Sequence, residues 1–290
     1  MRFYILSDLH LGNKVAENEA CTLLSKLCRD IRSTTAEGET VLFVILGDIA
    51  HRGDTLSFDI ASRCLDFVCD ELKDFVVKFE FVPGNHDLEK DDQNLLLFDS
   101  LTKKYGSSHS FNEKTAYSRV YENVNFIFAD STLSRDHSAS GQLDIAAIQT
   151  EVKKDMSNVL FCHHALTQED NSGHDTIENA EQVYEQLNLQ GISFLFHGHV
   201  HYSNAIIPKE GMVEIGCGSL SDNLDWGKSL FNQFGVGYIQ DGKVICFQRF
   251  INTSDHETFA SNQLYPYQAS FSDPNTILKK VYSSVFIAGV

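Results

Sequence analysis

The sequence contains no apolar stretch that approaches the roughly 18–20 residues that a membrane-spanning helix requires. It opens directly on a short apolar segment that ends at polar residues, which differs from the basic and apolar regions of a secretory leader. We therefore expect neither a membrane anchor nor export, and we predict a cytoplasmic protein.

Cysteine pairs at metal-binding or redox spacings are also absent. The seven cysteines, at positions 21, 28, 64, 69, 162, 217 and 246, are odd in number, scattered, and form no C-x-x-C motif. This usage excludes zinc-finger-like sites and the disulfide framework of a small secreted protein. Several of the cysteines lie within apolar periodic runs, so we expect buried and reduced thiols.

Basic residues are few, because 23 Lys and Arg stand against 40 Asp and Glu, which gives a formal net charge of −17. No cluster of Lys and Arg of useful length occurs anywhere in the chain. Nucleic-acid binding depends mainly on contacts between basic side chains and phosphates, so the composition disfavours long DNA or RNA as a partner. A metal centre would nevertheless bring positive charge of its own to such a surface.

Apolar periodicity predicts helices that alternate with short buried strands. Helical spacing favours helices at 19–31, 58–72, 94–105, 142–152 and 178–189. Short apolar runs bounded by polar residues predict strands at 2–6, 41–46, 79–82, 117–120, 124–130, 159–162, 192–196, 205–208, 212–215, 234–240 and 243–250. Asp241-Gly242 separates the last two runs and is typical of a tight hairpin turn.

This order of elements predicts an α/β fold. Strands and helices alternate in the first half, whereas strands dominate the second half, so two mixed sheets facing each other with helices outside would bury both. The prediction is a four-layer α/β/β/α sandwich formed by one domain at 1–250. Residues 251–290 are predicted as a C-terminal extension, polar at 252–274 and more apolar at 277–290, which packs back or binds an oligomer or protein partner.

Five of the apolar runs stop at groups that bind metal ions. They lead into Asp8-Leu9-His10, Gly47-Asp48, Gly84-Asn85-His86-Asp87, His163-His164 and Gly198-His199-Val200-His201. In open α/β sheets, ligand sites form at the carboxyl ends of the strands. Carboxylate, carboxamide and imidazole groups together suit Mn, Fe or Zn rather than a thiolate site or a calcium cage. The sequence therefore predicts a polynuclear metal site, and Asp48 is the best bridging candidate because it stands alone at its strand end.

These motifs, in this order and each after a predicted strand, resemble those of the calcineurin-like metallophosphoesterases over residues 1–220. The resemblance implies two divalent ions, one held by Asp8, His10 and His201 and the other by Asn85, His163 and His199, with Asp48 between them. It further implies that His86 binds no metal but stabilises the transition state or protonates the leaving oxygen. Asp87 would then orient the imidazole of His86.

Two departures from the family pattern are His51 and Ala165-Leu166, where a Pro is common, and several residues near the motifs leave alternatives open. His51 stands where the family often has a second Asp, and it either contacts substrate or faces solvent in a loop. Arg52 resembles a phosphate-contacting Arg of the protein-phosphatase branch, but a capping or surface role competes with that interpretation. His164 contacts substrate or a metal ligand, or it packs in the core. We expect His197 to be structural.

The predicted function is hydrolysis of a phosphodiester, with small nucleotide-type substrates favoured, by attack of a hydroxide that bridges two Mn, Fe or Zn ions. The motif spacing looks more like the branch that cleaves cyclic nucleotides and glycerophosphodiesters than like the Ser/Thr protein phosphatases. The alternatives are a nuclease, a phosphomonoesterase or a protein phosphatase of the same family. A non-catalytic scaffold would have lost metal ligands, and this sequence retains all of them.

Overall fold

The structure is a computed structural model that describes residues 1–137, 140–166, 176–201, 203–206, 212–220, 232–240 and 243–251. The predicted extension at 251–290 lies outside the described residues beyond its first position, as do the Asp-Gly turn and the end of the predicted strand at 205–208.

The described residues form helices and strands close to those that the sequence predicts. The helices are α1 (Lys14–Thr34), α2 (Thr55–Glu71), a short 3-10 helix η1 (Asn85–Asp87), α3 (Leu96–Lys104), α4 (Ile145–Glu151) and α5 (Ala180–Leu189). The strands are β1 (Arg2–Leu6), β2 (Thr40–Leu46), β3 (Val76–Val82), β4 (Ala116–Tyr121), β5 (Val124–Ala129), β6 (Ser157–Phe161), β7 (Ile192–His197), β8 (Ser203–Ile206), β9 (Val213–Cys217), β10 (Asn232–Gln240) and β11 (Lys243–Ile251).

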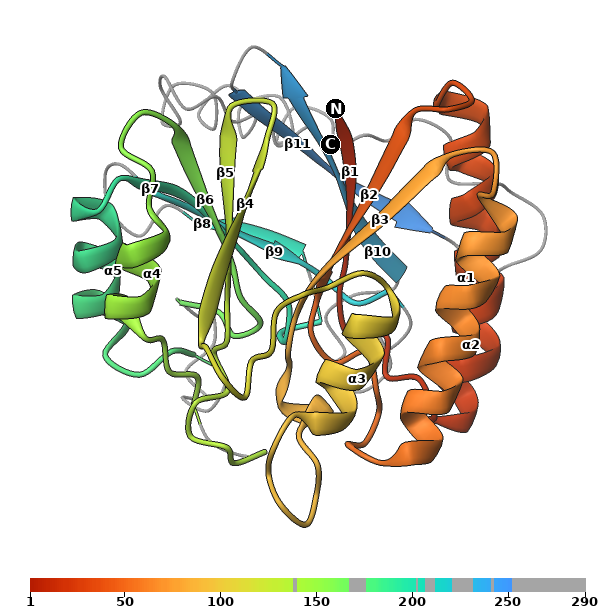
Figure 1. Cartoon of the computed structure of the whole chain (residues 1–290), viewed down its shortest axis with the longest axis horizontal. Coiled ribbons are helices and arrows are strands. Elements are labelled where there is room, and N and C mark those ends of the chain that lie inside the picture. Colours follow the sequence, from red (N-terminus) through yellow and green to blue (C-terminus); the bar gives the residue numbers. More distant parts are fainter. Residues whose placement is uncertain are drawn as a thin grey trace, which may run out of the picture.

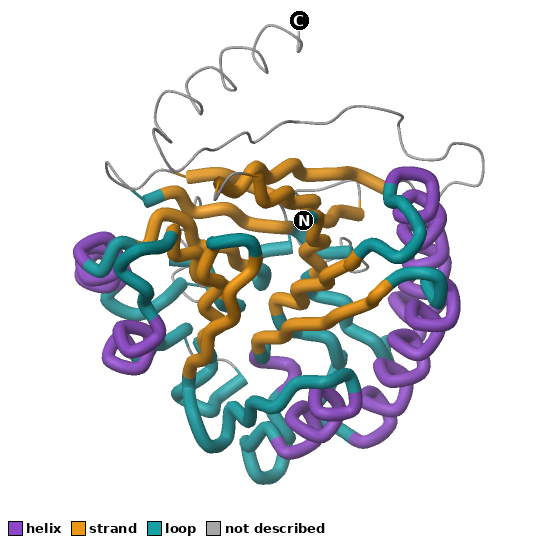
Figure 2. The backbone as a smooth tube through the Cα atoms, turned by 45° about the horizontal axis from the view of Figure 1, so that its top comes forward, coloured by secondary structure: helices purple, strands orange, loops and turns teal. Residues whose placement is uncertain are grey.

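The strands form two mixed sheets, which confirms the predicted sandwich. One sheet has the order β11-β10-β1-β2-β3, and the other has the order β4-β5-β6-β7-β9-β8. Helices α1, α2 and α3 lie outside the first sheet, and α4 and α5 lie outside the second (Figure 1). The tube view shows the same layers, with the strands in the middle and helices on both sides (Figure 2).

Parallel pairing aligns the strand ends that carry the ligand motifs. In the first sheet β1 pairs with β2 and β2 with β3 in parallel, with Leu6 opposite Ile45 and Leu46 opposite Val82. In the second sheet β6 and β7 are parallel, with Phe161 opposite Phe196. The carboxyl ends of parallel strands share one edge of a sheet, so the segments that follow these five strands emerge together.

Phenylalanine rings fill the space between the sheets. The ring of Phe161 lies 4.9 Å from that of Phe126, 5.2 Å from that of Phe128 and 5.2 Å from that of Phe196, between centroids. All four side chains are buried. The ring of Phe3 in β1 reaches this cluster, with its centroid 5.1 Å from that of Phe126, so the rings help to hold the second sheet against the first.

We expect Phe161→Ala to lower the free energy of unfolding by about 3–5 kcal/mol, because it leaves a cavity in the ring cluster. Urea denaturation followed by circular dichroism measures the change. Leu96→Ala is the matched control, because Leu96 is 61% exposed and its truncation should cost less than about 0.5 kcal/mol. Equal losses in the two variants would contradict the importance of the inter-sheet rings.

Within the part of the chain that the structure describes, no helix has both the length and the apolar character that crossing a bilayer demands.

Candidate metal centre

The segments that follow β1, β2, β6 and β7 are tied together by backbone hydrogen bonds. The amide of His10 donates to the carbonyl of Asp48 over 2.9 Å, which joins the first two segments. The amide of Gly198 donates to the carbonyl of His163 over 3.0 Å, which joins the other two. These bonds position the motif residues relative to one another before any side chain is considered.

Several motif residues adopt the left-handed backbone conformation that non-glycine residues avoid. They are Asp8 (φ 53°), His10 (φ 43°), Asp48 (φ 51°), His199 (φ 66°) and His201 (φ 57°), half of the ten described non-glycine residues with positive φ. Such conformations cost free energy and persist where the surroundings enforce them, which occurs most often at functional sites. The backbone therefore singles out this cluster as a candidate site without reference to its side-chain chemistry.

The first ligand group contains Asp8, His10 and His201. Nε2 of His201 lies 3.4 Å from Oδ1 of Asp8 and 3.2 Å from Nε2 of His10. Nε2 of His10 lies 3.7 Å from Oδ2 of Asp48. All of these residues are buried, and their ligand atoms face one common point.

The second group contains Asn85, His163 and His199. Nε2 of His163 lies 3.1 Å from Oδ1 of Asn85 and 3.1 Å from Nδ1 of His199. Nε2 of His163 also lies 3.4 Å from Oδ2 of Asp48. Nδ1 of His163 is hydrogen-bonded to the carbonyl of Leu46 over 2.7 Å, which directs the other ring nitrogen, Nε2, toward the group.

The carboxylate of Asp48 belongs to both groups through a single oxygen. Its Oδ2 is the atom near His10 and the atom near His163. Its Oδ1 instead accepts the backbone N–H of His86 over 2.8 Å. The structure therefore brings together all seven of the predicted ligand side chains and places Asp48 between the two groups.

The arrangement fits a pair of cations. Two imidazole nitrogens 3.2 Å apart, as in His10 and His201, repel each other unless a proton or a cation lies between them. Burial would lower the pKa of His163, but the Asp48 and Asp8 carboxylates raise it to about 9. The protein matrix around these side chains therefore favours positive charge, and nitrogen and oxygen donors of this kind suit Mn, Fe or Zn.

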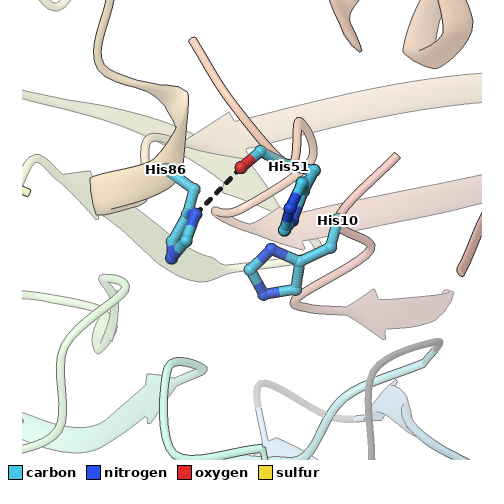
Figure 3. Close-up of side chains that lie close together, drawn as sticks. All are labelled: His10, His51 and His86. Carbon is cyan, nitrogen blue, oxygen red and sulfur yellow. Dashed lines mark hydrogen bonds between the residues drawn. The ribbon is translucent and has the colours of Figure 1, made fainter. Parts of the chain in front are cut away.

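His86 and His51 stand beside the first group. Nδ1 of His86 donates to the backbone carbonyl of His51 over 2.9 Å (Figure 3). The rings of His10 and His86 are perpendicular, with centroids 4.8 Å apart, and those of His51 and His86 are nearly parallel at 5.9 Å. One nitrogen of each of the three rings lies within 4.8 Å of the others. The side chain of His51 thus faces the centre rather than bulk solvent alone.

The carboxylate of Asp87 is hydrogen-bonded to backbone amides of the centre rather than to the imidazole of His86. Its Oδ1 accepts the amide of Ala50 over 3.0 Å and its Oδ2 accepts the amide of Gly84 over 2.9 Å. Burial and the nearby Asp48 carboxylate raise the pKa of Asp87 to about 7. The family resemblance implied that Asp87 orients His86. The carbonyl of His51 makes this contact instead, and no sequence motif indicates it.

His164 and Arg52 lie in opposite environments. His164 is buried, its Nδ1 is 2.8 Å from the hydroxyl of Ser131, and its ring lies 4.5 Å from that of His199. This geometry favours packing beneath a ligand over a substrate contact for His164. The side chain of Arg52 is exposed next to His51.

Sequence reasoning missed several residues that support the ligands. The hydroxyl of Ser131 accepts the amides of His163 (3.2 Å) and His164 (3.1 Å), and the hydroxyl of Ser219 donates to the carbonyl of Asp8 over 2.9 Å. The carbonyl of His137 accepts the side-chain amide of Asn85 over 2.9 Å. Serine and backbone groups far from the motifs carry no sequence signal for such contacts. His197 is fully buried with Nε2 3.4 Å from Glu214, as expected of a structural residue.

We expect Gly84→Ala to cost about a hundredfold in metal affinity or turnover, a loss typical of groups that position metal ligands. A Cβ at Gly84 would overlap Oδ1 and the backbone amide of Asp48. The carboxylate, and with it the shared Oδ2, would have to move. Metal analysis and steady-state assays measure the effect. Gly106→Ala is the control for backbone strain alone, because Gly106 has a positive φ of 92°, unlike Gly84 with its φ of −108°, and its Cβ would meet nothing within 4 Å. Unchanged metal content in Gly84→Ala would contradict the tight packing at Asp48.

Comparisons with known proteins agree with this geometry. A family model described as calcineurin-like phosphoesterase matches residues 1–203. The uncharacterized metallophosphoesterase-like protein YydB of Bacillus subtilis is 30% identical over 103 residues, which are 36% of this chain but only 21% of that protein. A solved dimetal phosphatase from Danio rerio has a TM-score of 0.63 at 17% identity and covers 86% of this chain and 96% of its own. At that identity the likeness shows a shared fold.

Proposed function

Because the chain belongs to the calcineurin-like phosphoesterase family, we propose that it hydrolyses a phosphodiester with two divalent metal ions. The observation that carries the proposal is the pair of ligand groups that share one oxygen of Asp48. Asp8, His10 and His201 would hold one ion, and Asn85, His163 and His199 would hold the other. Bound there, the ions would supply an activated water and offset the charge of the phosphate.

His86 is the proposed proton donor to the leaving oxygen. Its Nδ1 is engaged by the carbonyl of His51, so a protonated imidazole has only its Nε2–H available for substrate. The carbonyl fixes the orientation of the imidazole by accepting this hydrogen bond. His86 is half-buried and its ring lies 4.8 Å from that of His10, so it is close enough to the centre to reach the leaving oxygen of a bound ester.

Charge directs the choice of substrate. With a net charge of −17, the protein repels a long polyanion, so a small nucleotide-type diester is the favoured substrate. The exposed guanidinium of Arg52 favours a phosphomonoester as the second candidate, because a monoester dianion carries one more negative charge than a diester.

A substrate and metal panel tests the proposal. The protein is stripped with a chelator, reloaded with Mn, Fe or Zn, and assayed on bis(p-nitrophenyl) phosphate, p-nitrophenyl phosphate, cyclic nucleotides and linear DNA. The proposal expects no turnover after stripping, recovery on reloading, and faster hydrolysis of small diesters than of the monoester or DNA. Faster hydrolysis of the monoester would favour the second candidate, and turnover that survives complete stripping would contradict the metal-dependent mechanism.

We expect Asn85→Ala to bind one ion per chain instead of two and to lose most of its turnover, because only the second group loses a ligand. Metal content by plasma mass spectrometry, at matched free metal concentration, measures the occupancy. Asn112→Ala is the control, because the amide of Asn112 bonds Asp99 far from the centre. Two tightly bound ions in Asn85→Ala would contradict the role of Asn85 as a ligand.

The identity of the native metals, a cytoplasmic location, the domain limits at 250 and a partner-binding role for residues 251–290 stay predictions from the sequence.

A further inference from the structure

Helices α1 and α2 pack side by side outside the five-stranded sheet (Figure 1). One cysteine of each helix approaches the other. Sγ of Cys21 in α1 lies 3.6 Å from Sγ of Cys64 in α2. The two residues are 43 positions apart, so their spacing in the sequence gave no sign of a pair. The structure therefore brings together two of the thiols that the sequence treated as unrelated.

The two thiols differ in access to solvent. Cys21 is exposed, whereas Cys64 is 4% exposed and lies in the core. A small reagent reaches Cys21 first, and Cys64 is the adjacent thiol that can resolve the product. Because a disulfide bond is about 2 Å long, the sulfurs must approach by less than the width of one atom, which a change of side-chain rotamer provides.

Other thiols between the helices are poorer nucleophiles. Burial and the neighbouring Glu71 raise the pKa of Cys28 to about 12. Burial and the acidic side chains of Asp66 and Asp70 raise the pKa of Cys69. Because the thiolate is the reactive form, the raised pKa values make Cys28 and Cys69 less reactive.

We propose that Cys21 and Cys64 form a redox-modification site that a low-molecular-weight disulfide converts into an intramolecular disulfide. The thiolate of Cys21 attacks one sulfur of glutathione disulfide, breaks its S–S bond and releases one glutathione. The thiolate of Cys64 then attacks the sulfur of Cys21 in the mixed disulfide and releases the second glutathione. Two protein thiols are oxidised, one glutathione disulfide is reduced to two thiols, and the two protons end on glutathione.

The bond would tie together the two helices that begin beside the metal centre. Helix α1 begins four residues after His10 and α2 begins four residues after His51. The loop that the bond closes contains Asp48 and the whole of β2. Such a covalent link restricts the unfolded chain and stabilises the ligand-bearing segment, and reduction by thiols reverses it.

Peptide mapping of the full chain tests the proposal. The protein is incubated with glutathione disulfide, the remaining thiols are alkylated at low pH, and the digest is analysed by mass spectrometry. We expect one cross-linked pair of peptides, joined through Cys21 and Cys64 with the loss of two hydrogens. A lasting glutathione adduct on Cys21, cross-links through other cysteines, or no reaction at Cys21 would each overturn the proposal.

Variants and a melting curve sharpen the test. Cys21→Ser should prevent the cross-link without disturbing the fold, because Cys21 is exposed, whereas Cys69→Ser should leave the cross-link unchanged. Oxidation of the wild type should raise the melting temperature by about 5 °C, and a reducing agent should reverse the rise. A cross-linked protein that melts at the same temperature would overturn the stabilising role. None of these measurements depends on hydrolase activity, so they stand apart from the test of the proposed function.

Discussion

Asp48→Asn should lose both metal ions and about a thousandfold or more in turnover. Oδ2 of Asp48 lies near a ligand nitrogen of each group, and an amide in its place carries no negative charge. An amide oxygen turned toward the amide of His86 would place NH2 against His10 and His163, where it repels a cation. Both groups would therefore weaken together.

Metal titration and steady-state kinetics on the same preparations measure this loss. Asp66→Asn is the charge-matched control, because Asp66 makes a surface ion pair with Lys104 over 2.7 Å and should affect neither quantity. If Asp48→Asn kept one tightly bound ion and lost only the other, the shared-oxygen arrangement would be refuted in favour of a ligand to one ion alone.

His86→Ala should keep both ions yet lose about a hundredfold to ten-thousandfold in turnover of substrates with alkyl leaving groups. The side chain of His86 belongs to neither ligand group, and only its backbone amide touches Asp48. The loss should shrink for p-nitrophenyl esters, because p-nitrophenolate leaves without a proton. A leaving-group series in the wild type and the variant measures the difference in slope.

His109→Ala is the control for His86→Ala, because His109 packs against Phe111 and Tyr117 away from the centre. It should retain turnover and the wild-type slope. An equal loss for all leaving groups in His86→Ala would assign His86 to charge stabilisation instead of proton transfer. Full activity in His86→Ala would remove it from the mechanism.

The fold follows from the sequence because apolar residues recur at helical spacing in the helices and form short continuous runs in the buried strands. The predicted helix at 58–72 and the strand at 41–46 match α2 (Thr55–Glu71) and β2 (Thr40–Leu46) closely. β3 begins three residues earlier than predicted, at Val76, because its first three residues are at least partly exposed and Lys78 interrupts the apolar run. Helix α1 begins at Lys14 rather than at the predicted residue 19, because residues 14–18 are mostly polar and lack the apolar spacing of the rest of the helix.

The candidate site was predictable to the extent that its ligands lie at strand ends. The sequence indicated the seven side chains, but which oxygen of Asp48 is shared depends on hydrogen bonds that only coordinates show. The carbonyl of His51 behind His86 has no residue-specific signal, since every residue has a carbonyl. The Cys21–Cys64 contact depends on how two helices pack, which periodicity does not encode.

Each ligand group contains residues that follow strands of both sheets, and these residues are synthesised at different times. The first group joins two residues after β1 with His201, and the second joins Asn85 after β3 with His163 and His199. Neither half of the chain alone therefore contains all the ligands of either ion. If the proposed function holds, a nascent polypeptide emerging from the ribosome would acquire its ions only after its late histidines have appeared, so metal uptake would mark the completion of the molecule.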